Sequence, residues 1–186
     1  MTAPLAPGPD GTPVPAGVRL IRMANEPKLA NLNAVAQERV RAGKALPAFF
    51  ELSSEDKAQP VPRLSVWVEG LTTAQQAWVL VGAVPTRNWV VLLNADAVRA
   101  AETGTEPKLD VHWERATMLT PAGERVLEMR PGWDGHAGIT NLDCGNKPHR
   151  AALRLYLADI AEMRVLTVED LTATDGGSDD PSHRVK

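Results

Sequence analysis

The spacing of apolar and polar residues predicts half-buried strands over 18–23, 63–69 and 109–114. In the second stretch, apolar residues recur at every other position from Leu64 to Val68. Successive side chains of a strand point to opposite faces, so this period places the apolar side chains on one face of a sheet. The same alternation in the third stretch predicts a strand that turns its apolar side chains to the core.

Two longer apolar runs, over 77–84 and 89–93, predict strands that are buried on both faces. The short Pro-Thr-Arg-Asn segment between them suits a hairpin. A second interpretation stays open for 72–84. Its first residues, Thr-Thr-Ala-Gln-Gln-Ala, suit a helical turn, and the whole segment can form one helix.

A clear turn signal lies at 120–123, where the sequence reads Thr-Pro-Ala-Gly. Proline in the second position and glycine in the fourth are typical of a type I β-turn. A further strand is predicted over 124–130, directly after the turn. We therefore expect 109–114 and 124–130 to pair as a β-hairpin.

Apolar residues at helical spacing predict two main helices, at about 26–42 and 147–163, and a short helix near 95–102. Asn25 and Asn146 precede the two main helices. The asparagine side chain can accept a hydrogen bond from the first turn, so both residues are expected N-caps.

The order of the predicted elements favours an α+β fold with a mainly antiparallel sheet of about five to seven strands, because consecutive strands with short connections lie between helices. Residues 165–171 add a last strand or a short helix. One domain is expected over 18–171. Residues 1–17 are rich in proline and predict a flexible arm, and the polar residues 172–186 predict a flexible tail.

Charge and composition exclude several classes of function. The formal net charge is −3 and the basic residues are scattered, which argues against a protein that binds nucleic acid through its phosphates. A single cysteine excludes an intramolecular disulfide. No apolar run reaches the ~18 residues of a membrane span, and the first residues lack a secretory pattern. We therefore expect a cytoplasmic protein, or one incorporated in a particle assembled there, with no membrane partner.

The connector 130–149 joins the predicted hairpin to the last helix and gathers most of the reactive side chains, Asp134, His136, Asp143, Cys144 and His149. Imidazole, thiolate and carboxylate are the ligands of transition metals. One hypothesis is therefore a metal-dependent hydrolase or nuclease. In it, His136, Cys144 and His149 bind zinc or another divalent transition metal, and Asp134 and His136 are catalytic.

The alternative interpretation of the connector needs no bound group. Its aspartates then form turns beside glycine, and its cysteine is a small buried residue. This interpretation predicts no catalytic residue and no cofactor.

Tryptophan is unusually frequent, with five tryptophans against two phenylalanines and one tyrosine. Trp67 lies on the more polar side of its strand and Trp133 lies in the connector. Both can anchor a protein interface, although a sheet covered on both faces would bury Trp67. Together with Arg130 they are the predicted binding residues. The leading hypothesis is a non-enzymatic protein-binding or assembly module. Its partner is another protein or a second copy, as in a phage-like particle.

Overall fold

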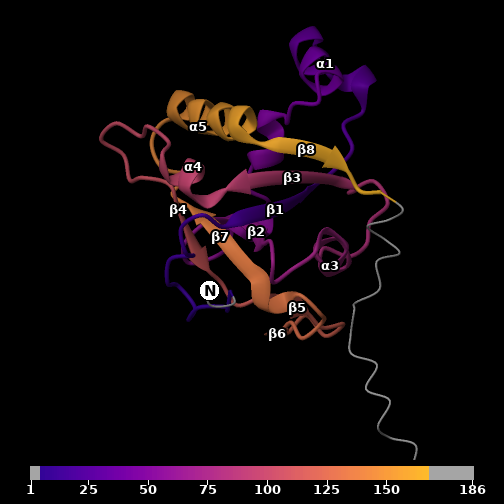
Figure 1. The fold of residues 1–186 in the computed structure, drawn as a ribbon, viewed down its shortest axis with the longest axis vertical. Coiled ribbons are helices and arrows are strands. Elements are labelled where there is room, and N and C mark those ends of the chain that lie inside the picture. The colour runs from indigo at the N-terminus through magenta and orange to yellow at the C-terminus, as the bar shows by residue number, and fades with distance from the viewer. Residues whose placement is uncertain (1–4, 168–186) are drawn as a thin grey trace, which may run out of the picture.

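The fold is built on a six-stranded sheet in which all neighbouring strands are antiparallel, in the order β4-β7-β2-β1-β3-β8. The computed structural model describes residues 5–167, and Figure 1 shows their arrangement. The strands are β1 (Arg19–Ala24), β2 (Arg63–Val68), β3 (Trp89–Asn94), β4 (Asp110–Trp113), β7 (His136–Thr140) and β8 (Glu162–Val165). The predicted α+β class with a mainly antiparallel sheet is confirmed.

Helices pack on both faces of this sheet (Figure 1). They are α1 (Ala34–Arg41), α2 (Ser54–Lys57), α3 (Ala74–Leu80), α4 (Ala95–Arg99) and α5 (Lys147–Ile160). The helices α4 and α5 bury their apolar residues against one face, and α3 buries its alanines against the other. No helix within 5–167 combines the length and the apolar character that a membrane span needs.

The two faces of the sheet carry separate hydrophobic cores, and β2 contributes to both. Leu64, Val66 and Val68 lie in the larger core with α4 and α5. Trp67, between them, lies in the smaller core with Ala77 of α3. The alternation seen in the sequence therefore sorts these side chains correctly. Trp67 is only 6% exposed, so the structure supports the interpretation in which a sheet covered on both faces buries it.

The predicted hairpin forms around the expected turn, but with a different partner strand. The strands β5 (Thr117–Leu119) and β6 (Arg125–Leu127) pair with each other, whereas β4 pairs with β7. The prediction that 109–114 pairs with 124–130 is therefore wrong. Burial explains the outcome, because β7 is buried along its whole length while every residue of β6 is exposed. Only β7 can continue the core beside the buried side chains of β4.

The first main helix is shorter than expected. It starts at Ala34, and its N-cap is Asn33, whose side chain accepts a hydrogen bond from the Ala36 amide. Asn25 is not the cap. Its neighbour Glu26 instead donates its amide to the carbonyl of Thr86. Helical backbone is also disfavoured at Glu26, because this residue precedes a proline. This hydrogen bond and the proline at position 27 therefore keep residues 26 and 27 out of the helix.

The other helical predictions are largely confirmed. Asn146 caps α5 as expected, and α5 ends at Ile160, since 162–165 form the edge strand β8. The open choice for 72–84 is decided in favour of a helix, α3, which starts with a reciprocal capping box between Thr73 and Gln76. The predicted strand over 77–84 and its hairpin with 89–93 are therefore wrong, since β3 pairs with β1 and β8. The short helix α4 spans Ala95–Arg99.

The proline-rich start of the chain packs against the sheet. Gly11 and Val14 donate their amides to the carbonyls of Trp113 and Val111, so this segment continues the sheet beyond β4. Val14 is 2% exposed. The prediction of a flexible arm over 1–17 therefore stays a prediction, with the qualification that residues 11–14 are hydrogen-bonded to β4. The predicted tail over 172–186 lies outside the described residues.

Candidate functional site

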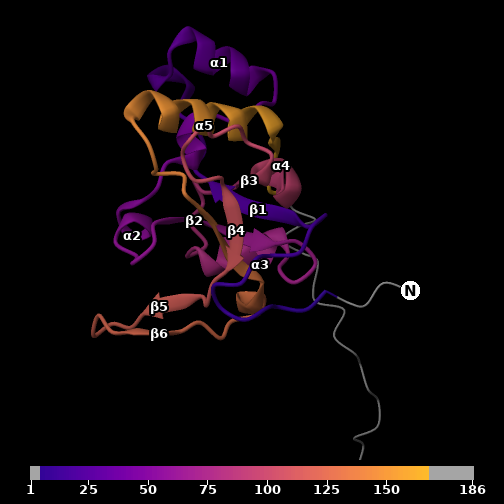
Figure 2. The ribbon, with the colours of Figure 1, turned by 90° about the vertical axis from the view of Figure 1, so that its left-hand side faces the viewer.

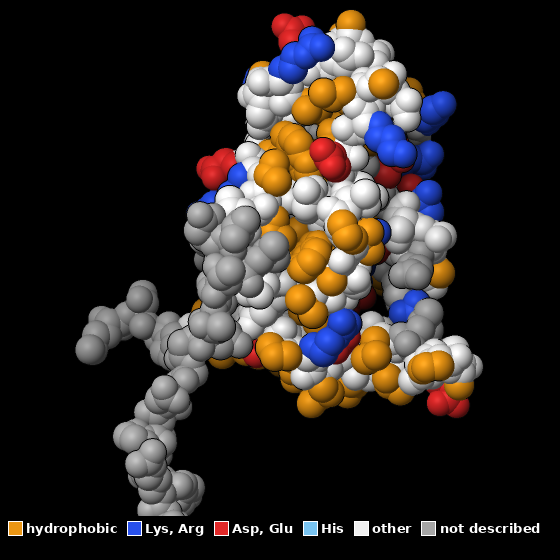
Figure 3. All heavy atoms as spheres, turned by 90° about the vertical axis from the view of Figure 1, so that its right-hand side faces the viewer, with side chains coloured by type: hydrophobic (Ala, Val, Ile, Leu, Met, Phe, Trp, Pro, Cys, Tyr) orange, Lys and Arg blue, Asp and Glu red, His pale blue; other side chains and the backbone are white. Residues whose placement is uncertain are grey.

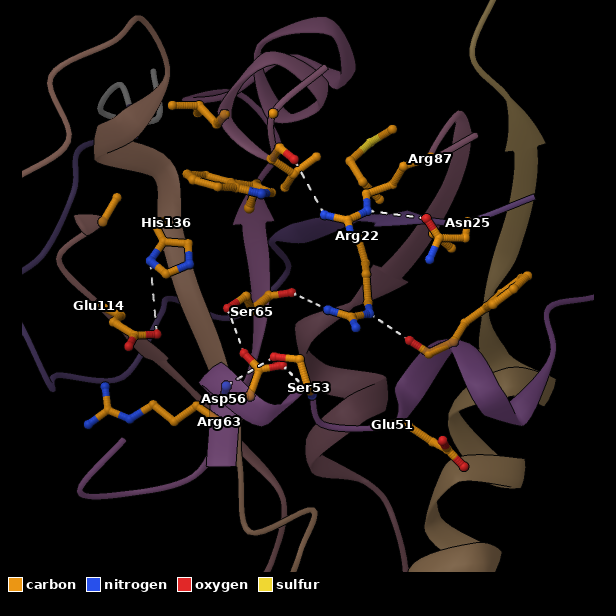
Figure 4. Close-up of a pocket in the computed structure, with 18 of the residues that line it drawn as sticks. Arg22, Asn25, Glu51, Ser53, Asp56, Arg63, Ser65, Arg87, Glu114 and His136 are labelled. Atoms are coloured by element: carbon orange, nitrogen blue, oxygen red, sulfur yellow. Dashed lines mark hydrogen bonds and ion pairs between the residues drawn. The ribbon is translucent and has the colours of Figure 1, made fainter. Parts of the chain in front are cut away.

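A cavity opens where two central strands of the sheet separate. The strand β1 pairs with β3 along its whole length, but with β2 only at Leu20 and Ile21. Beyond this point β1 and β2 diverge and leave a cavity of about 810 Å³. Figure 4 shows polar side chains from several elements pointing into it. The sheet itself thus forms a binding space.

Arg22 crosses the gap between the diverging strands. Its Nε donates to the carbonyl of Phe49 at 2.6 Å, and its Nη1 donates to the carbonyl of Ser65 at 2.8 Å (Figure 4). Loss of hydration in the cavity wall lowers the pKa of Arg22 to about 10, and Asp56 partly opposes this shift. Arg22 remains charged at neutral pH. It replaces the strand-to-strand hydrogen bonds that the gap removes.

Asp56 of α2 lies beside this arginine with its hydrogen bonds satisfied. One carboxylate oxygen accepts from the Ser53 amide at 2.9 Å, and the other accepts from the Ser65 hydroxyl at 3.0 Å. The Asp56 amide donates to the Ser53 hydroxyl in return. Since the Ser65 hydroxyl donates to a carboxylate, the described geometry does not activate it as a nucleophile through an imidazole.

The imidazole of His136 lies in the cavity wall beside Trp67. The residue is 9% exposed, and its ring centroid lies 4.5 Å from that of Trp67, its register partner across β2 and β7. Its Nδ1 is buried without a hydrogen-bond partner. The nearest carboxylate oxygen, Oε2 of Glu114, is 3.9 Å away, too far for a hydrogen bond (Figure 4). A buried polar atom without a partner costs stability, so this arrangement calls for a functional explanation.

Burial shifts the titration of both members of this pair. It lowers the pKa of His136 to about 4, and a hydrogen bond with the backbone of Glu114 partly opposes the change. It raises the pKa of the Glu114 carboxyl, which the nearby Arg63 partly offsets. At neutral pH the imidazole is therefore neutral. A neutral ring beside a buried carboxyl can accept and exchange protons, and it can also bind a hydrogen-bond donor.

A two-stranded arm, formed by β5 and β6, borders the cavity and projects from the body (Figure 2). Arg130 anchors its base by bonding Glu128 at 2.6 Å and the last carbonyls of α3, those of Val79 and Leu80. The hydrogen bond from Arg130 lowers the pKa of Glu128 to about 2. Arg130, predicted as a binding residue, thus has a structural role at the base of the arm.

The structure separates the residues that the connector hypothesis groups together. His136 lies at the start of β7, whereas Cys144 and His149 follow the other end of this strand. No group of three or more His, Cys, Asp or Glu residues within 5–167 is arranged to hold a metal ion. Trp133 is partly buried against the smaller core, and Asp134 lies in the 3-10 turn that precedes β7.

Several residues of the cavity were not among the predicted site residues. Arg22 shares its strand face with Leu20 and Ala24, which belong to the larger core. A charged residue at a position where the alternation predicts a core side chain can be recognised in the sequence, so Arg22 could have been singled out. Asp56 and Arg63 give no such signal, because a loop and a strand start commonly carry exposed charges.

Comparisons of the chain with protein-family models, with curated proteins and with solved structures each find no match.

Proposed function

We propose that this chain is a non-enzymatic protein-binding module that holds its partner through the β5–β6 arm. The main support is a concentration of exposed apolar side chains on the short β5–β6 ribbon and at its base. Met118, Val126, Leu127 and Met129 are 39%, 40%, 49% and 68% exposed. Apolar side chains gathered in this way mark sites of protein contact.

The architecture of the arm supports this proposal. Met118 and Val126 are register partners, so their side chains lie next to each other across the ribbon. In the space-filling view of Figure 3, hydrophobic side chains gather along the lower edge of the molecule, at the end where Figure 1 draws the arm. A two-stranded ribbon on its own is marginally stable in water.

The anchor at the base of the arm holds it in place before a partner arrives. Arg130 and Glu128 link the arm to the end of α3. A surface ordered in advance loses less conformational entropy on binding, so the anchor favours tight association. The partner is another protein or a second copy of the chain, and an assembly such as a phage-like particle is one setting for either.

Crosslinking at defined positions tests the proposal. A photoreactive residue is placed at Val126 on the arm and, as a control, at Val35 on α1, which is 69% exposed. We expect a discrete crosslinked product from position 126 in the producing cells, and its loss when Met118→Lys is added. The mass of that product identifies a second copy or another protein.

Equal products from both positions, or no product from position 126, would contradict the proposal. The Met118→Lys substitution is exposed, so its effect on the free energy of unfolding should stay within about 0.5 kcal/mol. A thermal melt of the variant checks this.

A further inference from the structure

Two opposite charges in the cavity wall, those of Glu114 and Arg63, form no ion pair with a charged side chain within 5–167. The side chain of Glu114 is 17% exposed, and the one basic group within ion-pair distance of it is the neutral His136. The guanidinium of Arg63 lines the same cavity and, within 5–167, joins no ion pair and donates no hydrogen bond. Buried charges usually occur as pairs, because desolvation of an unpaired charge is costly.

The side chains of Glu114 and Arg63 approach each other over Gly138, which has no side chain to separate them. It lies in β7 between β2 and β4, and a Cβ atom at this position would lie 2.9 Å from Cδ of Arg63 and 3.1 Å from Oε2 of Glu114. The two side chains therefore lie over the bare backbone of Gly138 from opposite sides. They can contact a single small molecule without making an ion pair with each other.

His136 adds a third recognition element at the same point. Its buried Nδ1 is unpartnered and faces Oε2 of Glu114 across 3.9 Å. In a neutral ring whose other nitrogen is the donor, Nδ1 offers a lone pair. An ammonium group has three donors, so it can bond both the imidazole and the carboxylate. The guanidinium of Arg63 suits a carboxylate, which it can bind through two parallel hydrogen bonds.

We propose that this cavity binds a small zwitterion, with its ammonium group held by Glu114 and His136 and its carboxylate held by Arg63. Free α-amino acids carry this pair of groups. The wall beyond the charged residues includes Trp67 and Leu80. These side chains favour an amino acid with an apolar side chain. The proposal is independent of partner binding by the arm.

Calorimetric titration of the full chain at pH 7 tests the proposal. The panel is leucine, phenylalanine, glycine, acetate, methylammonium and N,N,N-trimethylglycine. We expect saturable binding of the two apolar amino acids. Acetate and methylammonium should bind at least about tenfold more weakly, because each lacks one charge-assisted hydrogen-bonding group. Trimethylglycine keeps both charges but has no N–H donor, so it should also bind weakly.

Variants connect the binding to the named residues. Glu114→Gln and Arg63→Gln should each weaken leucine binding by about tenfold or more. The control substitutions Glu38→Gln and Arg41→Gln remove the same charges from α1, outside the cavity lining, and should leave the affinity unchanged. Thermal melts show whether each variant is folded. If one is not, Arg63→Lys, which keeps the charge but loses the paired donors of the guanidinium, serves in its place.

Three results would overturn the proposal. They are no heat of binding for any amino acid of the panel, acetate binding as tightly as leucine, and unchanged leucine affinity in a folded Glu114→Gln protein. A ring shift of His136 in NMR spectra on adding leucine supports the assignment. A saturated complex without that shift counts against it.

Discussion

The two faces of the central sheet use similar strands for different purposes. On one face, α4 and α5 seal a large core in which Leu20, Val66 and Leu157 are completely buried. On the other face, α3 covers a smaller core, and beside it lies a cavity lined by Arg63, His136 and other polar residues. Apolar burial accounts for the first face. It does not account for the charged groups of the second, which points to binding.

The largest expected effect lies on the sealed face. Leu157→Ala removes a completely buried side chain from α5, and we expect it to lower the free energy of unfolding by about 2–5 kcal/mol. Leu155→Ala, on the same helix but at a position 44% exposed, should change it by less than about 0.5 kcal/mol. Chemical denaturation measures both. Equal losses would show that α5 does not seal the core.

On the cavity face, His136 should make stability depend on pH. Its pKa in the folded protein is lowered to about 4, below the value of ~6.5 in an unfolded chain. The unfolded chain therefore binds a proton more readily between these values, and stability falls as the pH falls from about 6.5 to 4. The loss is on the order of 2–3 kcal/mol.

Urea denaturation over this pH range, compared with His136→Gln, isolates the contribution of His136. The variant should lose less stability than the original protein between pH 6.5 and 4. Parallel curves would mean that the imidazole is not held neutral by burial.

Arg22→Met should have a moderate effect. The substitution keeps much of the length of the side chain but removes the donors to the carbonyls of Phe49 and Ser65. We expect a loss of about 1–3 kcal/mol in the free energy of unfolding, since two acceptors lose their partner. Arg41→Met, at an exposed position, is the control. Hydrogen exchange of the β2 amides should increase only in the Arg22 variant.

The smallest effect is expected for added metal. Within 5–167 the structure gathers no group of three metal ligands, so Zn²⁺ at a modest excess should leave the melting temperature unchanged. A ligand that binds the folded state must raise it. A clear upward shift that disappears in Cys144→Ser would revive the hypothesis of a metal site at the connector.

Local patterns in the sequence predicted much of the fold. The alternation around Leu64 places Trp67 on the opposite face from its neighbours, and Thr-Pro-Ala-Gly at 120–123 gives the turn of the arm. The partner of β4 could not be predicted in this way. Pairing between distant strands depends on which faces become buried together, and β7 emerges only after the arm.

The candidate site was predicted only in part, for the same reason. His136 was singled out, but its neighbours are Trp67 of β2 and Glu114, which directly follows β4. The expected neighbours, Cys144 and His149, lie beyond the far end of β7 because an extended strand carries the chain away at ~3.3 Å per residue. Grouping residues by their proximity in the sequence therefore assigned the wrong neighbours to His136.

The central claim is that the Glu114 carboxylate serves binding at a cost to folding, and the stability of Glu114→Gln tests it most directly. Burial raises the pKa of the Glu114 carboxyl, so ionisation destabilises the folded protein above that pKa, and the penalty fades as the pH falls toward the unfolded value. At pH 7 the variant should be at least as stable as the original protein, with the difference vanishing in acid. A clear loss of stability at pH 7 would show that the carboxylate helps to hold the fold together and would contradict the claim.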